Sequence, residues 1–412
     1  MKKSFFIYAK LSLIVLCFAS CKNSESDQSS VVPGVTDTEI KVGSWGPLTG
    51  PAALWGSIPK SIDAYFKMIN DEGGIHGRKI NLIYKDDAYD PSRTVPVVRE
   101  LVQKEEVFAV AGGVGTAPNM AVMGFLEENK VPWVTPMTGA TAMTQPIKEN
   151  IYSTFTLYFD EGEIMAKHAL NEMSLSKIAI IYQNDDFGKS GLVGAKKILQ
   201  KNNLDFVAAL PVEITDTDLS SHVARLKDSG AEAVMLWVLP RQAAIVLGTS
   251  SVVNFKPQWM ASQVLSDMAL MFDITKGGWK DVLYAFPTDV NYNDKSNPTM
   301  SKYQEAYKKY YPEERWGAFA YSGFLAMEPF AEALRIAGKD LTRASFLEAL
   351  SSLNNYSGAS GVPISFSKDK HLGSRTMYLM KCVSATEAEA VGPGITGDSN
   401  IGELSKMLEE SN

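Results

Sequence analysis

The alternation of short apolar runs with longer helical periods is the feature that most constrains how this chain folds. "EIKVGS" and "INLIYK" are strand-like runs, and the stretch between them carries apolar residues at helical spacing (Ile58, Ile62, Tyr65, Phe66 and Ile69). The same alternation resumes after residue 160 with "KIAIIY" and "AEAVMLWV". Strands that alternate with helices predict βαβ units, and right-handed crossovers then favour two doubly wound parallel sheets. The predicted fold class is therefore α/β.

The size and charge of the chain narrow the function classes. At 412 residues the chain is long enough for two or three domains. Its net charge is -7, and its acidic and basic residues are interspersed. A nucleic-acid-binding protein normally carries a basic stripe. We therefore expect no nucleic-acid partner.

The first twenty residues have the pattern of a signal peptide. Lysines precede the apolar run "LSLIVLCFA", which is too short to cross a bilayer, and the small residues Ala19 and Ser20 follow it. The sequence "FASC" resembles the lipobox of bacterial lipoproteins, which implies lipidation of Cys21, although Phe18 departs from the usual aliphatic residue. The alternative is an ordinary signal peptide in which Cys21 has no special role.

The residues after Cys21 predict a tether. Residues 21–35 are polar and rich in serine, which is typical of a flexible linker. Cys17 would leave with the signal peptide and Cys21 would carry lipid, so Cys382 alone would remain and no disulfide framework is expected. The sequence predicts membrane attachment through the lipid anchor only.

Four loops that each follow a predicted strand are candidates for a binding site. They are "GPLTGPAALW", "GGVGTAPN", "TPMTGAT" and "YQNDDFGKSG". Open α/β sheets bind ligands outside the carboxyl ends of their strands, so these loops are expected to converge. Trp55 belongs to the first loop. The alternative is that Trp55 only covers its loop against the neighbouring helix.

The motifs that would indicate catalysis are incomplete. A P-loop ending at "GKSG" would need glycine where Gln183 stands, "GGVGTA" does not satisfy G-x-G-x-x-G, and no G-x-S-x-G elbow occurs. The four histidines lack a second ligand at metal spacing. Asp86, Asp87 and Asp90 suit either a hard-cation site or a polar loop before a helix that starts with proline. We expect no enzyme, cofactor or metal.

Three segments carry a resemblance to a known family. "EIKVGSWGPLTGPAALWG", "INDEGGIHGRKINLIYKDDAYDPSR" and "VPWVTPMTGAT" resemble the leucine/isoleucine/valine-binding protein family, over about residues 36–384. The resemblance implies the substrate-binding component of an ABC importer with the type I periplasmic binding fold. Two Rossmann-like lobes would be joined by crossovers near Thr154, Pro287 and Tyr356 and would close on a ligand.

These crossovers give the predicted domain boundaries. Lobe 1 would comprise residues 36–154 and 287–355, and lobe 2 residues 155–286 and 356–386. The acidic, glycine-containing segment 387–412 is predicted to be a mobile tail with at most one short helix.

The resemblance also implies ligand-binding positions. An aromatic side chain against the ligand falls on Trp55, and donors to a ligand carboxylate fall on Thr116 and on the next loop (Met137, Thr138 and Gly139). N–H and O–H groups at a helix start hold carboxylates well. The second lobe and the returning helix would contribute Phe187, Leu239 and Tyr321, although Leu239 replaces an aromatic residue.

Two further positions depart from the family pattern. The family's amino-acid binders hold the ligand ammonium with acidic side chains, and these positions fall on Tyr158 and Gln263. A buried ammonium without an anionic partner is costly, so an amine-free carboxylate or an amide is favoured over a free amino acid. A small shift of the alignment would bring Asp160 or Asp186 to the site and restore the charge.

The resulting hypothesis is a lipid-anchored, monomeric solute-binding protein on the periplasmic or extracellular face of a bacterial membrane. It would deliver an organic acid, an amide or an amino acid to an ABC permease. One alternative is a ligand-sensing module that needs a separate membrane partner. Others are a cleft enzyme, which would need a nucleophile and a base near Thr116 or Gln263, and a surface lipoprotein without ligand-dependent closure.

Overall fold

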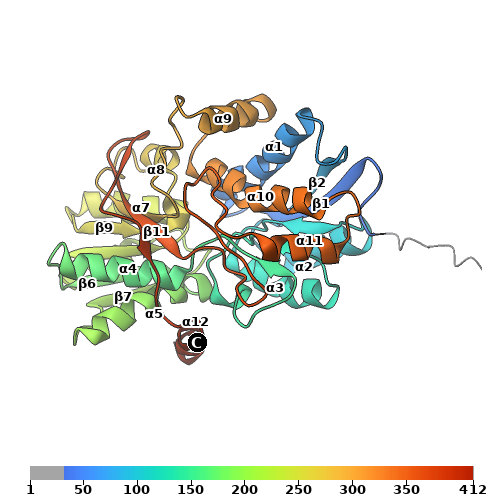
Figure 1. The fold of residues 1–412 in the computed structure, drawn as a ribbon. Coiled ribbons are helices and arrows are strands. Elements are labelled where there is room, and N and C mark those ends of the chain that lie inside the picture. The colour runs from blue at the N-terminus through green and yellow to red at the C-terminus, as the bar shows by residue number, and fades with distance from the viewer. Residues whose placement is uncertain (1–31, 412) are drawn as a thin grey trace, which may run out of the picture. The chain divides into compact units, whose positions relative to one another are not determined.

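Two parallel sheets organise the computed structural model, which describes residues 32–411 (Figure 1). The first sheet has the strand order β2-β1-β3-β4-β5, and every neighbouring pair is parallel. Its strands are β1 (Glu39–Gly46), β2 (Lys79–Asp86), β3 (Ala109–Ala111), β4 (Trp133–Val134) and β5 (Ile151–Tyr152).

The second sheet has the order β12-β11-β10-β9-β8-β6-β7. Its parallel part comprises β6 (Ile178–Gln183), β7 (Ala208–Val212), β8 (Ala233–Trp237), β9 (Gln258–Ala261) and β10 (Leu283–Phe286). The antiparallel edge comprises β11 (Thr376–Cys382) and β12 (Ala388–Ala390), and the short β13 (Ile395–Thr396) also pairs with β11. The predicted α/β class with parallel sheets in two lobes is confirmed.

Each lobe combines segments that are far apart in the chain. In Figure 1 the blue and cyan elements lie beside the orange helices α10 and α11, whereas the green and yellow elements surround the red strand β11. The helices of the first group are α1 (Ser57–Asp71), α2 (Pro91–Gln103), α3 (Thr116–Glu128), α9 (Pro298–Tyr310), α10 (Ala318–Ala337) and α11 (Arg343–Ser352). Those of the second group are α4 (Tyr158–Asn171), α5 (Asp186–Lys201), α6 (Ser220–Asp228), α7 (Pro240–Val252) and α8 (Met268–Ile274).

The aspartates of the "KDDAYDP" segment have structural contacts. The side chain of Asp90 caps α2 by accepting a hydrogen bond from the Ser92 N–H, and Pro91 starts the helix. The Asp87 carboxylate accepts from the Thr94 hydroxyl at 2.8 Å. In residues 32–411 no group of three or more His, Cys, Asp or Glu side chains is arranged to hold a metal ion. These contacts favour the polar-loop interpretation of the segment.

Three connections join the two sheets. They run from β5 to α4, from β10 to α9 and from α11 to β11. The predicted crossover positions Thr154 and Pro287 lie in the first two. Tyr356 lies near the start of the third, which still contacts the first lobe further on, because the Gly373 N–H donates to the Ser153 carbonyl at 2.8 Å. The lobe boundaries stay predictions.

The C-terminal segment differs from the mobile tail that the sequence predicts. β12 and β13 pair with β11, and helix α12 (Ile401–Ser411) packs Met407 and Leu408 against Phe159 and Val193. Arg375 donates to both carboxylate oxygens of the buried Asp160, at 2.7 and 2.5 Å, and to the Ser399 carbonyl at 2.8 Å. Unpaired strand edges attract further strands, so the edge of β11 gives this segment a place to bind.

Two expectations concern the membrane. Residues 1–31, which hold the predicted signal peptide and Cys21, lie outside the described residues, so the lipid anchor stays a prediction. None of the helices in the described part of the chain is long and apolar enough to span a bilayer.

The close approach of α4 and α5 yields a stability prediction. A Cβ atom on Gly194 would lie 2.3 Å from the Phe159 carbonyl oxygen, which belongs to the backbone of α4. We expect Gly194→Ala to lower the free energy of unfolding by about 1–3 kcal/mol, because the helices must separate. Urea unfolding of the variant measures this change.

Gly248→Ala is the matched control for this prediction. Gly248 also lies within a helix, α7, and a Cβ atom there would meet nothing within 4 Å. We expect this variant to be more stable by about 0.5–1 kcal/mol, because alanine is the better helix former. An equal loss of stability in both variants would contradict the close-packing argument.

Candidate functional site

A cavity of about 510 Å³ lies between the two lobes, and half of the residues that line it are aromatic. We call it the aromatic chamber. Trp55, Tyr89 and Phe319 come from elements of the first lobe, and Phe187 and Phe286 from those of the second. Phe155 lines it from the connection between β5 and α4. Concave, mostly apolar spaces of this kind are typical of small-molecule sites.

Trp55 connects the lobes across this chamber. It ends the short 3-10 helix η1 (Ala53–Trp55), is only 4% exposed, and its ring meets the Tyr89 ring edge-on with centroids 5.5 Å apart. Its indole N–H donates to the Val264 carbonyl at 3.0 Å, in the loop that follows β9. The loop tryptophan therefore lines the cavity and bonds to the opposite lobe.

Tyr158 places its ring and its hydroxyl in different surroundings. The ring lines the chamber and packs edge-on against Phe187, with centroids 4.9 Å apart. The hydroxyl lies near the Gly139 N–H and the hydroxyls of Thr138 and Thr116. Burial raises the pKa of Tyr158, so the phenol is neutral at physiological pH.

The donors that the resemblance assigns to a ligand carboxylate are thus brought together by the fold. The hydroxyls of Thr116 and Thr138 lie 2.7 Å apart and both are buried. They meet the Tyr158 hydroxyl, however, and neither threonine lines the chamber, whereas the Met137 side chain does. The protein's own phenol therefore lies beside these donors, and the two threonine hydroxyls bond to each other.

Gln263 lines the chamber, and an acidic residue lies behind it. The backbone N–H of Gln263 donates to Glu161 Oε2 at 3.0 Å, and its side-chain amide donates to Glu161 Oε1 and to the Thr156 hydroxyl. Glu161 is fully buried, and burial raises its pKa to about 8. It lines neither this chamber nor the second cavity described below. Glu161 was not predicted, although it lies one helical turn after Tyr158.

The other acidic candidates lie elsewhere. Asp160 pairs with Arg375, and Asp186 begins α5 without lining the chamber. Leu239 and Tyr321 are buried but also lie outside the chamber wall. The Tyr321 hydroxyl donates to the Ala359 carbonyl at 3.1 Å. The ligand-binding roles of the predicted residues stay predictions.

Several lining residues were not predicted. Tyr89 is one of them, although it follows β2 and therefore lies at the edge of the sheet where the carboxyl ends of the strands meet. Phe155 and Phe286 lie in or beside the connections between the lobes, and Ser322 and Phe319 lie on α10. The predicted crossover positions Thr154 and Pro287 were the sequence signal that could have identified Phe155 and Phe286 as lining residues.

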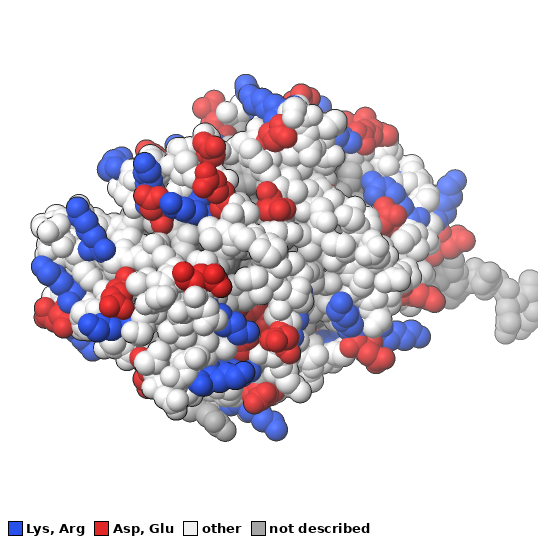
Figure 2. Space-filling view, turned by 60° about the vertical axis from the view of Figure 1, so that its left-hand side comes forward, with Lys and Arg blue, Asp and Glu red and all other residues white. Residues whose placement is uncertain are grey.

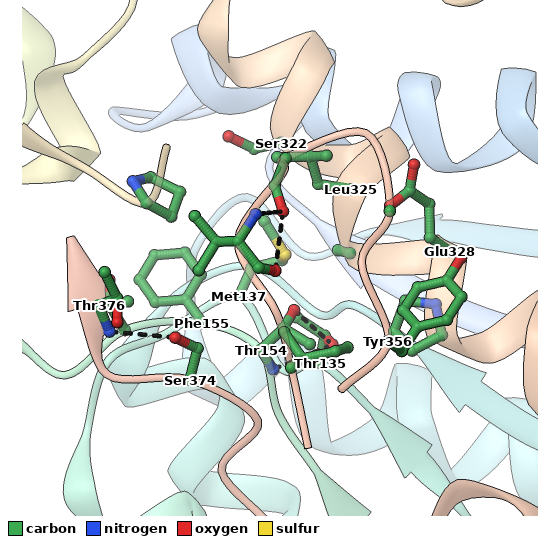
Figure 3. A pocket seen from close by; sticks show the side chains of 18 of the residues that line it. Thr135, Met137, Thr154, Phe155, Ser322, Leu325, Glu328, Tyr356, Ser374 and Thr376 are labelled. Carbon is green, nitrogen blue, oxygen red and sulfur yellow. Dashed lines mark hydrogen bonds between the residues drawn. The ribbon is translucent and has the colours of Figure 1, made fainter. Parts of the chain in front are cut away.

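A second cavity of about 690 Å³ adjoins the chamber at the connections between the lobes (Figure 3). We call it the hinge cavity. Figure 3 shows hydroxyl side chains around it, among them Thr135, Thr154 and Ser374, with Glu328 and Tyr356 on one side. Both cavities share Met137, Phe155, Gln263 and Ser322 as wall.

The residues that line the two cavities carry almost no charge. Among the described residues that line the two cavities, Glu328 is the only one of the types Asp, Glu, Lys, Arg or His. On the outer face in Figure 2, acidic and basic side chains are interspersed, without a continuous basic area among the residues drawn in colour. The site therefore suits a largely uncharged small molecule.

Known proteins with similar sequence or fold are solute-binding proteins. A stretch of 197 residues is 33% identical to Leu/Ile/Val-binding protein homolog 3 of Brucella melitensis and spans about half of each chain, 48% of this one and 53% of the relative. A fatty acid ABC transporter substrate-binding protein from Thermomonospora curvata is 27% identical, with a TM-score of 0.80 over 91% of this chain and 95% of that one.

A branched chain amino acid ABC transporter protein from Thermus thermophilus, solved with bound valine, shares the fold at 18% identity. Its TM-score is 0.79, over 92% of this chain and 99% of that one. The family model for periplasmic binding proteins matches residues 39–387, which include both sheets up to β11 and the residues that line both cavities. The predicted resemblance is confirmed, and the chain belongs to the periplasmic binding protein family, with the two-lobed type I fold.

Proposed function

We propose that this protein is the extracytoplasmic solute-binding component of an ABC importer and that it traps a small organic ligand by closure of its lobes. The observation that carries the proposal is the aromatic chamber, to which both lobes contribute wall and across which Trp55 bonds to Val264. A ligand in this chamber stabilises the closed state, because it contacts both lobes only there. The closed form would then be the one that the permease recognises.

The lining indicates the chemical class of the ligand. The chamber offers aromatic and aliphatic surface and no charged side chain among its described lining residues. Thr116 and Thr138 bond to each other and do not line the chamber, so they offer no donor there to a ligand carboxylate, and a ligand ammonium in the chamber would lack a counter-charge. We therefore propose a ligand with an apolar body and without an α-amino-acid head group.

The named relatives are compatible with an apolar ligand body. Their names refer to leucine, isoleucine and valine, and to a fatty acid. These ligands share an aliphatic portion and differ in its length. We assign no chemical reaction to the site, since the relatives are binding proteins and the cavity lining offers hydrogen bonds and apolar surface.

Replacement of Trp55 tests the proposed site. We expect Trp55→Ala to weaken binding of an apolar probe, such as 3-phenylpropan-1-ol, by about 10- to 100-fold, because an aromatic wall is lost. Trp55→Phe should weaken it by about 3- to 10-fold, because the hydrogen bond between the lobes is lost. Isothermal titration calorimetry on the mature chain measures both affinities.

Trp259→Phe is the control for these variants. Trp259 lies on β9, packs against Phe255 and lines neither cavity, so its replacement should leave the affinity unchanged. Equal affinities of the wild type and both Trp55 variants would exclude the chamber as the binding site.

The buried Glu161 predicts a pH dependence of stability. Its pKa rises from an ordinary value of 4.5 to about 8 in the folded state, so folding favours its neutral form. The contribution of Glu161 to the free energy of unfolding is fully present below pH 4.5 and is lost as the pH rises towards 8. Over this range the free energy of unfolding falls by up to about 1.4 kcal/mol per pH unit. Glu161→Gln should be less sensitive to pH over this range.

Denaturant unfolding between pH 5 and pH 8 measures this difference. Glu172→Gln removes an exposed carboxylate from the end of the same helix and should keep the slope of the wild type. Identical slopes for the wild type and Glu161→Gln would show that Glu161 is ionised in the folded protein at both pH values.

A further inference from the structure

The hinge cavity is the continuation of the aromatic chamber. Met137, Phe155, Gln263 and Ser322 line both spaces, so the two cavities adjoin at these residues. Thr154, Pro287 and Tyr356, which lie in the three connections between the lobes, also line the hinge cavity. A ligand that extends from the chamber would therefore enter a space whose shape depends on the hinge.

The hinge cavity differs from the chamber in its polar groups. Glu328 of α10 is 6% exposed, and its carboxylate accepts hydrogen bonds from the Tyr303 hydroxyl at 2.5 Å and from the Ala359 N–H at 3.0 and 3.1 Å. These bonds hold the carboxylate at the wall (Figure 3). A carboxylate has about four lone-pair sites, so it keeps capacity for a further donor.

A backbone acceptor lies beside Glu328. Pro329 is inside α10 and has no N–H, so the Leu325 carbonyl lacks its helical partner four residues later. Leu325 and Pro329 both line the hinge cavity. This wall thus carries a buried carboxylate beside a helical turn with a free carbonyl, and no Lys, Arg or His is among the described residues that line the cavity.

Resting on the proposed binding function, we propose that the ligand spans both cavities and places an end that carries hydrogen-bond donors against Glu328 in the hinge cavity. The donor end is an ammonium or a neutral hydroxyl or amide, and the apolar body lies in the aromatic chamber. An anionic end is disfavoured there, because it would face Glu328 without a counter-ion. Burial raises the pKa of Glu328, and an ammonium beside it would favour its ionised form.

Three probes with one body and different ends test this inference. They are 3-phenylpropylamine, 3-phenylpropan-1-ol and 3-phenylpropanoate, titrated calorimetrically into the mature chain. We expect the carboxylate to bind at least about 10-fold more weakly than the better of the other two probes. The comparison of the amine with the alcohol shows whether the preferred donor is cationic or neutral. In Glu328→Gln the amine should lose about 10- to 100-fold in affinity, and the alcohol less than about 3-fold.

Two further variants keep the inference independent of folding effects. Glu332→Gln removes a carboxylate one turn along α10 that pairs with Arg335 and does not line the cavity, so it should bind all probes as the wild type does. Ala326→Leu fills part of the hinge cavity and should weaken the best propyl probe by about 10-fold. The shorter benzyl alcohol, which fits the chamber alone, should keep its affinity.

The possible results separate this inference from the proposed function. Equal affinities for the three ends, or equal effects of Glu328→Gln and Glu332→Gln, would overturn the placement of the donor end and leave the binding function intact. No binding of any of these probes, benzyl alcohol included, would count against the apolar ligand class itself and overturn both.

Discussion

Parallel strand pairing is the constraint on which the site depends. In a parallel sheet all carboxyl ends lie at one edge, so the loops that follow different strands are brought together there. In the first sheet, Trp55 follows β1, Tyr89 follows β2 and Met137 follows β4. In the second sheet, Gln263 follows β9 and Phe286 is the last residue of β10. The aromatic chamber is the place where these two sets of loop residues meet.

Hydrogen bonds within the site decide which groups remain for a ligand. Thr116, Thr138 and the Gly139 N–H form a donor cluster of the kind that holds anions, but the two threonine hydroxyls bond to each other and the Tyr158 hydroxyl lies beside them. Glu161 is likewise satisfied by the amide groups of Gln263. Because a buried polar group is costly unless it is paired, such groups are paired within the protein, and no charged side chain is among the described residues of the chamber wall.

The connections between the lobes serve both the hinge and the binding surface. The segment after α11 is held to the first lobe by the bonds of Ala359 with Glu328 and Tyr321 and by the pairing of Gly373 with Ser153. It reaches the second lobe at Arg375, which is paired with the buried Asp160. Several residues that line the hinge cavity, among them Thr154, Pro287 and Tyr356, therefore belong to the segments that connect the lobes.

The sequence by itself determined the α/β class and the place of Trp55 in a loop after the first strand, because periodicity and loop position are local properties. The two-lobed fold was implied by the resemblance of three segments to a known family. The sequence could not place Glu161 or Glu328, since nothing local distinguishes a buried carboxyl group on a helix from an exposed one. It also predicted a mobile tail where β12, β13 and α12 bind to the second lobe, because strand pairing with β11 is a long-range contact. Only the tertiary structure decided that Tyr158 turns its hydroxyl onto Thr116 and Thr138, because that geometry requires α3, α4 and the loop after β4 to meet.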